Sequence, residues 1–218
     1  MLFVIDGSDG SGKATQVALL GERLGAEGHQ VKTIDFPRYT DNKFGKLLRE
    51  CLDGKRGDFM KMDPRIASTL YAADRFESSG LIREWLDSGN IVVADRYVSA
   101  NMLHQGTKVQ DEVKLKDFLT WLDEVEHGVF NLPRPDLIIY LEVPYSVRGL
   151  LLKNDKSRKS LDSSELDEEH QIATEKAAQT LVSSLNNWQP VNCVKDGQLR
   201  SREDIHEEIY QLVCSKLK

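Results

Sequence analysis

A glycine-rich loop that directly follows a short apolar run constrains this chain more than any other feature. Residues 2–5 are Leu-Phe-Val-Ile, a run typical of a buried strand, and residues 7–15 follow as Gly-Ser-Asp-Gly-Ser-Gly-Lys-Ala-Thr. In a phosphate-binding loop of this spacing, backbone N–H groups surround phosphate oxygens at the start of a helix. The order of strand, loop, lysine and helix predicts that the chain binds a nucleoside triphosphate. The residues assigned to that site are Gly7, Ser8, Gly10, Ser11, Gly12, Lys13, Ala14 and Thr15.

The loop departs from the usual pattern at one position. The residue after the lysine is normally Ser or Thr, whose hydroxyl helps to hold Mg²⁺. Here that residue is Ala14, and Thr15 comes one position later. Mg²⁺ at this loop must therefore depend on other oxygen ligands.

Composition indicates an ordinary globular protein. Of the 218 residues, 40% are hydrophobic and 29% are charged, and we expect one domain spanning residues 1–218. The net charge of −6 and the lack of a basic block argue against a nucleic-acid partner. No apolar stretch is long enough to cross a membrane, and no leader precedes the first strand. Because the three cysteines are scattered and lack metal spacing, we expect reduced thiols and a cytoplasmic location.

Strand-like and helix-like segments alternate along the chain. Apolar runs typical of strands occupy residues 2–6, 31–36, 91–94, 137–143 and 190–194. Helical spacing of apolar residues occupies 14–27, 64–88, 111–127, 144–153, 165–187 and 202–217. Asp63-Pro64 has the pattern of a helix cap followed by proline at the first helical position. The alternation predicts a three-layer α/β/α fold with a five-stranded parallel sheet.

In such a sheet, ligands bind outside the carboxyl ends of the strands. Asp95 and Arg96 follow the buried run 91–94, where a carboxylate can hold Mg²⁺ and a guanidinium can hold phosphate with two hydrogen bonds. The alternative is a helix-capping aspartate beside a surface arginine. The segment 36–39, Phe-Pro-Arg-Tyr, ends the second run and suits a base or phosphate site, with an ordinary turn as the alternative.

Five segments together resemble the thymidylate kinase family, and the resemblance covers nearly the whole chain. The phosphate loop alone is shared by many nucleotide kinases and GTPases, whereas the Phe-Pro and Asp-Arg-Tyr pair with its downstream asparagine is much more selective. The resemblance implies ATP-dependent phosphorylation of dTMP to dTDP with Mg²⁺, by a P-loop NTPase fold with a short lid and as a homodimer. The segments that carry it are residues 7–16, 36–39, 72–75, 95–101 and 132–143.

The resemblance also implies roles for charged residues. Asp9 is similar to the carboxylate that contacts the 3′-hydroxyl of the acceptor and helps to organise Mg²⁺, together with Asp95. Lys13 would bridge the donor phosphates and the migrating phosphoryl group. Arg38 and Arg96 are similar to arginines that hold the acceptor phosphate.

The resemblance assigns a second set of residues to the base and sugar of dTMP. Phe36 is similar to a wall of the thymine pocket, and Asn101 to a residue that bonds the pyrimidine edge. Tyr71 and Arg75 lie four residues apart and so share one helix face. In the family, the aromatic residue stacks on or lines the base and the arginine bonds a thymine carbonyl. The alternative is that Tyr71 packs against a helix and that Arg75 is a surface arginine paired with a carboxylate. The remaining acceptor residues are Tyr39, His104 and Gln105.

Two positions qualify the resemblance. His104 stands where family members often carry a tyrosine that screens the 2′ position of the sugar, or it is a histidine on a helix surface. Members of the family supply an arginine to the transition state from either the phosphate loop or the lid. This phosphate loop contains no arginine, so the resemblance implies that the cation comes from the polar lid at about 153–165. Of Lys153, Lys156, Arg158 and Lys159, Arg158 has the planar fork that suits phosphate oxygens best. A merely solvated charge run is the alternative.

Three other functions are compatible with parts of the pattern. The chain could phosphorylate another nucleoside monophosphate or a deoxynucleoside. A GTPase-like switch would need Asn-Lys-x-Asp, and residues 42–45, Asn-Lys-Phe-Gly, lack its aspartate and come too early. A nucleotide-binding scaffold without catalysis would be consistent with Ala14.

Overall fold

The computed structural model describes residues 1–109, 111–147 and 168–217. The expected lid at 153–165, with Arg158, lies outside the described residues, as does most of the expected helix 144–153. The strands are β1 (Leu2–Gly7), β2 (Val31–Asp35), β3 (Ile91–Asp95), β4 (Leu137–Glu142), β5 (Trp188–Asn192), β6 (Val194–Lys195) and β7 (Gln198–Leu199). The α-helices are α1 (Lys13–Ala26), α2 (Lys43–Leu52), α3 (Pro64–Glu77), α4 (Ser79–Asp87), α5 (Val98–His104), α6 (Glu112–Asp123), α9 (Glu168–Ser184) and α10 (Arg202–Cys214). Shorter turns are the 3₁₀ turns η1 (Phe59–Lys61) and η2 (Gly106–Lys108) and the π-helical turn η3 (Glu124–Val129).

The central sheet confirms the predicted architecture. Its five strands lie in the order β2-β3-β1-β4-β5, and each neighbouring pair is parallel. Every residue of β1 is buried, as expected for a strand covered on both faces. The register pairs Ile5 and Asp35 with Asp95, so the carboxyl ends of β1, β2 and β3 reach the same edge of the sheet.

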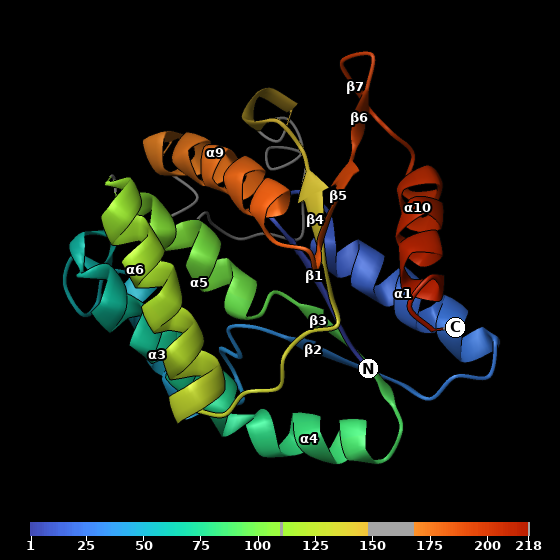
Figure 1. The fold of residues 1–218 in the computed structure, drawn as a ribbon, viewed down its shortest axis with the longest axis horizontal. Coiled ribbons are helices and arrows are strands. Elements are labelled where there is room, and N and C mark those ends of the chain that lie inside the picture. The colour runs from blue at the N-terminus through green and yellow to red at the C-terminus, as the bar shows by residue number, and fades with distance from the viewer. Residues whose placement is uncertain (110, 148–167, 218) are drawn as a thin grey trace.

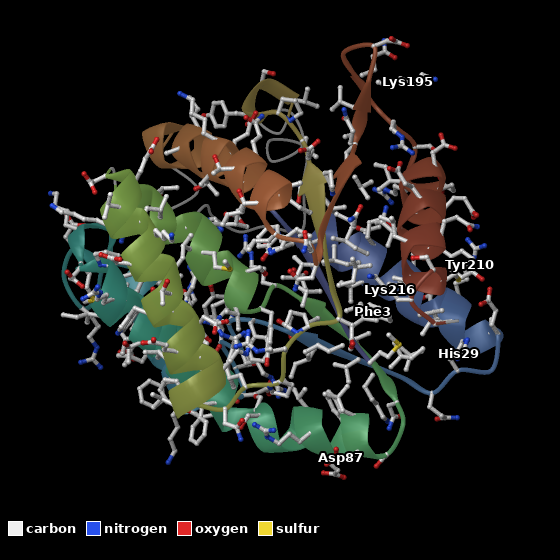
Figure 2. All side chains as sticks on the ribbon, viewed as in Figure 1. Phe3, His29, Asp87, Lys195, Tyr210 and Lys216 are labelled. Carbon is white, nitrogen blue, oxygen red and sulfur yellow. The ribbon has the colours of Figure 1, made fainter. Side chains whose placement is uncertain are left out.

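Two apolar cores cover the two faces of this sheet. Successive side chains of a strand point to opposite faces, so Leu2 and Val4 join one core while Phe3 and Ile5 join the other. Figure 1 shows α1 and α10 on one side of the strands, with α5, α6 and α9 on the other. In Figure 2, Phe3 lies inside the molecule between β1 and α1, whereas Lys195 stands at the far tip of the β6–β7 hairpin. The three layers place the phosphate loop and the strand ends at one edge, where a ligand can reach them.

Several elements differ from those that the sequence predicts. Asp63 caps α3 through its side chain as predicted, but the expected helix 64–88 breaks at Ser78 into α3 and α4. At this break the hydroxyl of Ser78 accepts hydrogen bonds from Asn42 Nδ2 at 3.0 Å and from Arg38 Nη1 at 3.2 Å, which tie the break to the segment after β2. The expected helix 111–127 ends at Asp123 and continues as the π-helical turn η3.

Some elements had no predicted counterpart. These are α2, α5 and the β6–β7 hairpin, while β5 begins at Trp188 rather than at residue 190. Helix α2 is amphipathic, with Leu48, Cys51 and Leu52 buried against Phe59 and Ala67 in a third apolar cluster. None of the described helices is long and apolar enough to cross a membrane.

Candidate active site

The phosphate loop connects β1 to α1 and depends on glycine at its first position. Gly7 has φ +152°, and a Cβ on it would lie 2.7 Å from Ser11 Oγ and 3.1 Å from the carbonyl oxygen of Leu141. Gly12 precedes α1 with φ +91°, in the left-handed region that glycine adopts without strain. These conformations leave the start of α1 open to an anion, where helix N–H groups and the helix dipole both attract negative charge.

Lys13 lies at the base of this loop. Its Nζ donates hydrogen bonds of 2.9 Å to the carbonyl oxygens of Gly7 and Ser8. Burial lowers the pKa of the Lys13 ammonium and Arg96 lowers it further, although nearby carboxylates act in the opposite direction. The structure therefore holds a buried cation against the loop that would surround a phosphate chain.

Arg96 follows the end of β3 in a strained backbone conformation. Its φ is +63°, a left-handed value that costs a non-glycine residue about 1–3 kcal/mol and is often found at functional sites. The backbone N–H of Arg96 donates to the carbonyl oxygen of Ile5 at 3.0 Å, which ties it to β1. This turn directs the guanidinium toward the phosphate loop, where it pairs with Asp9.

The ion pair of Asp9 and Arg96 controls the charge of the site. Burial alone would raise the pKa of the Asp9 carboxyl, but Arg96 and then Lys13 outweigh burial and hold that pKa well below its usual range. Burial would likewise lower the pKa of Arg96, and Asp9 reverses the effect. Asp9 is thus a carboxylate and Arg96 a cation at every physiological pH. Because Asp9 belongs to the loop and Arg96 to the turn after β3, this pair joins the two sides of the site.

The carboxylates at the strand ends fit Mg²⁺ in kind and number. Burial raises the pKa of the Asp95 carboxyl, and the opposing effects of Lys13 and Arg96 do not outweigh it. The described residues contain no cluster of three or more side chains that could hold a metal ion alone. Mg²⁺ is commonly bound by one or two carboxylates with phosphate oxygens and water. Asp9 and Asp95 suit that mode of binding, whereas Ala14 offers no hydroxyl.

A cleft opens beside the Asp9–Arg96 pair. The space between its walls, including space open to solvent, is about 680 Å³. Nine of the ten residues predicted for the acceptor site line it, although they come from four separate segments of the chain. They are Asp9, Phe36, Tyr39, Tyr71, Arg75, Arg96, Asn101, His104 and Gln105.

Arg38 is the predicted acceptor residue that does not line the cleft. Its guanidinium donates to Asp41 at 2.8 Å and to the hydroxyl of Ser78 at 3.2 Å, and its backbone N–H donates to Asp74 at 3.0 Å. Helix α2 approaches this turn so closely that a Cβ on Gly45 would collide with the carbonyl oxygen of Arg38. The turn after β2 is therefore held firmly, with the Arg38 side chain at its outer side.

The inner end of the cleft contains a buried arginine. Arg75 is 2% exposed, so it is not the surface arginine of the alternative interpretation, although it does pair with a carboxylate, that of Glu126. Its Nη1 donates to the carbonyl oxygen of Tyr97 at 3.2 Å. Asn101 lies beside it and donates to the same carboxylate and to the carbonyl oxygen of Ser68. The end of the cleft thus presents polar groups whose positions are set by buried hydrogen bonds.

Several buried polar atoms around the site have no hydrogen-bond partner within the described part of the chain. Those that belong to the phosphate loop or to residues lining the cleft are Ser11 Oγ, Arg96 Nε and Gln105 Oε1. Leaving a buried polar group unpaired costs about 1–3 kcal/mol. A polar ligand that satisfied these atoms would therefore bind with a favourable contribution from each.

Some lining residues were not predicted from the sequence. They are Pro37, Leu52, Phe59, Met60, Ala100 and Lys108. Phe59 and Met60 lie on η1 and belong to no motif, so only the packing of α2 against α3 places them here. Glu126 carries a usable signal, because it continues the four-residue spacing of the buried Phe118 and Leu122 along α6. A charged residue on an apolar helix face indicates a buried partner.

Comparison with known proteins agrees with this geometry. Residues 5–209 match the family model described as thymidylate kinase. The chain is 32% identical to a probable thymidylate kinase of Thermococcus onnurineus, with 100% of this chain and 98% of that protein covered. It is also 32% identical to the thymidylate kinase of Mycobacterium tuberculosis over 68% of this chain and 69% of that protein. A solved structure of thymidylate kinase from Candida albicans has the same fold, with a TM-score of 0.75, 22% identity, and 99% of this chain and 91% of that chain covered.

Proposed function

The chain belongs to the thymidylate kinase family, which phosphorylates dTMP to dTDP, and we propose that this member transfers the γ-phosphoryl group of ATP across the Asp9–Arg96 pair. The observation that carries the proposal is this ion pair. It lies between a loop suited to a triphosphate and a cleft suited to a nucleotide. Two nucleotides bound on its two sides would meet end to end at their phosphates.

The donor side is the loop from Gly7 to Thr15. Its backbone N–H groups bind the phosphates of ATP, and the ammonium of Lys13 leaves the carbonyl oxygens of Gly7 and Ser8 to contact them. This exchange is favourable because a phosphate oxygen carries more negative charge than a carbonyl oxygen.

The acceptor side is the cleft. Arg96 holds the monophosphate, while Asp9 contacts the sugar hydroxyl and Phe36 packs against the base. At the inner end, Arg75 donates a hydrogen bond to the base and Asn101 accepts one. His104 and Gln105 line the wall nearest the sugar.

Charge neutralisation at the phosphates provides most of the catalysis, because phosphoryl transfer requires little covalent chemistry from the protein. Lys13 and Arg96 are the cations that the described residues contribute, and we assign the transition-state cation of the lid to Arg158. Asp9 and Asp95 would hold Mg²⁺ together with phosphate oxygens. When bound, Mg²⁺ supplies further positive charge at the β- and γ-phosphates.

We also propose a homodimer that works in the cytoplasm. Large apolar side chains are exposed on α3, α6 and η3, which pack on one another, namely Ile66 (58%), Phe76 (50%), Val113 (71%) and Val129 (76%). A second copy would remove them from water. The cysteines are all free, as expected in a reducing compartment.

A substrate panel tests the proposed reaction. ADP release is measured with ATP and Mg²⁺ against dTMP, dUMP, dCMP, AMP and thymidine in turn. We expect dTMP to have the highest kcat/KM. A higher value for any other acceptor would replace the assigned substrate, and ATP binding without turnover on any acceptor would indicate a scaffold.

A further inference from the structure

Glu126 is a buried carboxylate that the reaction itself does not require. It is 0% exposed and lies on η3. Arg75 Nε donates to its Oε2 at 2.9 Å, Arg75 Nη2 donates to its Oε1, and Asn101 Nδ2 donates to the same Oε1 at 2.7 Å. Because burial of an unpaired carboxylate is very costly, these partners explain why the side chain is tolerated there.

This carboxylate determines which way the Asn101 side chain faces. The amide nitrogen of Asn101 lies 2.7 Å from Glu126 Oε1 and 3.1 Å from the carbonyl oxygen of Ser68. Both partners only accept hydrogen bonds, so the nitrogen rather than the oxygen must face them. Both amide hydrogens are thereby used. Oδ1 is the Asn101 atom left to face the cleft, where it accepts.

The same carboxylate holds the Arg75 guanidinium. Of its five N–H groups, two donate to Glu126 and one donates to Tyr97. The remaining N–H groups are on the terminal nitrogens, at the end of a side chain that lines the cleft. Glu126 therefore sets a hydrogen-bond donor next to a hydrogen-bond acceptor on one wall.

The π-helical turn explains how Glu126 reaches this position. Phe118, Leu122 and Glu126 are spaced by four residues and are all buried. In η3 the N–H of Phe130 donates to the carbonyl oxygen of Val125 at 2.8 Å, a bond that spans five residues. Such turns are rare in helices and are frequent at functional sites.

We infer that Glu126 is a positioning residue that sets the base preference of the acceptor cleft through Arg75 and Asn101. The inference rests on the proposed function, since it takes the cleft as the site of the nucleotide base. A donor beside an acceptor matches a pyrimidine with a carbonyl at C4 and a hydrogen at N3, which thymine and uracil have. Cytosine has a donating amino group at C4 and an accepting nitrogen at N3 instead. Its donor would meet the donor of Arg75, and its acceptor would meet the acceptor of Asn101.

Glu126→Gln is the informative substitution. A carboxamide has one accepting oxygen and one donating NH₂ group. Whichever way the new side chain lies, its NH₂ group meets a donor, either Arg75 Nε or the pair formed by Arg75 Nη2 and Asn101 Nδ2. In the first orientation Arg75 loses its Nε hydrogen bond, and in the second Asn101 is also released to rotate its amide, so the preference of the wall weakens in both.

The experiment measures kcat/KM for dTMP and dCMP in the wild type and in Glu126→Gln. We expect the ratio of dTMP to dCMP to fall by at least about tenfold, since a hydrogen bond to a charged group contributes about 1.5–3 kcal/mol. The KM for ATP should stay within about twofold of the wild-type value. Glu124→Gln is the matched control, because Glu124 is exposed on the same turn and loses the same charge.

A purely structural role gives a different result. It would lower the melting temperature and both activities while leaving the ratio of dTMP to dCMP unchanged, and that outcome overturns the inference. If Glu126→Gln does not fold, Glu126→Asp is measured instead. Aspartate keeps the charge but is one methylene shorter, so its carboxylate lies farther from Arg75 and Asn101. A fall in the ratio of dTMP to dCMP again supports the inference, and an unchanged ratio overturns it. A wild type that phosphorylates neither nucleotide overturns the proposed function instead.

A structure of the wild type with dTMP tests the inference without any variant. We expect N3 of thymine against Asn101 Oδ1, with Glu126 still bonded to Asn101 and Arg75. A bound dTMP whose base contacts Asn101 Nδ2, or a Glu126 that has left either partner, overturns the inference.

Discussion

The phosphate loop and the inner end of the cleft, where we propose that the base binds and which we call the base end, are built in opposite ways. The loop uses consecutive residues from 7 to 15, and its binding groups are mostly backbone N–H groups that glycines leave accessible. The base end uses side chains from segments far apart in the sequence, and Arg75 and Glu126 are separated by 51 residues. A local signal therefore reveals the first, whereas only the tertiary fold assembles the second.

The difference extends to the treatment of charge. On the loop side, Arg96 pairs with Asp9, but the hydrogen bonds of Lys13 within the described residues go to the carbonyl oxygens of Gly7 and Ser8, so its positive charge can attract phosphates. At the base end, the carboxylate of Glu126 balances the positive charge of Arg75. Arg75 therefore contributes an oriented hydrogen-bond donor there rather than net positive charge. We expect loop-side changes to affect the rate of transfer, and changes at the base end to affect stability and choice of base.

The largest expected effect concerns a cation from outside the loop. Because the phosphate loop at residues 7–15 contains no arginine, Arg158→Ala should lower kcat by about 10³-fold or more with little change in either KM. Steady-state kinetics with ATP and dTMP measure this. Lys156→Ala is the control on the same segment. A loss below tenfold in Arg158→Ala would transfer the role to a neighbouring lysine or remove it.

The second largest effect is expected from breaking the buried pair of Arg75 and Glu126. Arg75→Met leaves Glu126 buried without its cation and should lower the free energy of unfolding by about 3–5 kcal/mol. Urea denaturation followed by circular dichroism measures this change. Arg134→Met is the matched control, because Arg134 makes an exposed two-bond pair with Asp123 at 2.6 and 2.7 Å. Such a pair contributes about 0–1 kcal/mol. If Arg75→Met and Arg134→Met lost the same free energy of unfolding, the expected difference between the buried and the exposed pair would be wrong.

The smallest expected effect is a pH dependence of the base end. Burial lowers the pKa of His127, whose Nδ1 lies 2.9 Å from the carbonyl oxygen of Leu132 beside η3. Because the folded-state pKa lies below that of the unfolded chain, the unfolded chain binds the proton more tightly. Folding therefore loses stability as the pH falls below about 6.5. His127→Asn should show a smaller decrease in melting temperature between pH 7.5 and pH 5.5, as measured by scanning calorimetry.

The exposed His29 on the far side of the molecule supplies the control for that measurement. His29→Asn should retain the wild-type decrease in melting temperature. An unchanged decrease in His127→Asn as well would show that other groups cause the acid sensitivity.

Features of the molecule that depend on neighbouring residues in the sequence could be predicted, and features that depend on the tertiary fold could not. The five-stranded parallel sheet and the phosphate loop follow from apolar runs and glycine spacing, which are local, whereas the strand order was not predicted. Tyr71 and Arg75 were predicted to share a helix face, and both line the cleft. The spacing of Glu126 with Phe118 and Leu122 gave a local sign that Glu126 is buried, but its pairing with Arg75 could not be predicted, because that contact forms only on folding. The position of Phe59 and Met60 depends in the same way on how α2 packs against α3.

The close contact of α2 with the turn after β2 has a consequence for protein engineering. Since any side chain at position 45 would displace the carbonyl of Arg38, a saturation library selected for growth should return glycine alone at that codon. Neighbouring exposed positions such as Lys43 and Lys46 should accept many residues. Randomisation aimed at new acceptor specificity should therefore leave Gly45 untouched and begin on the cleft walls.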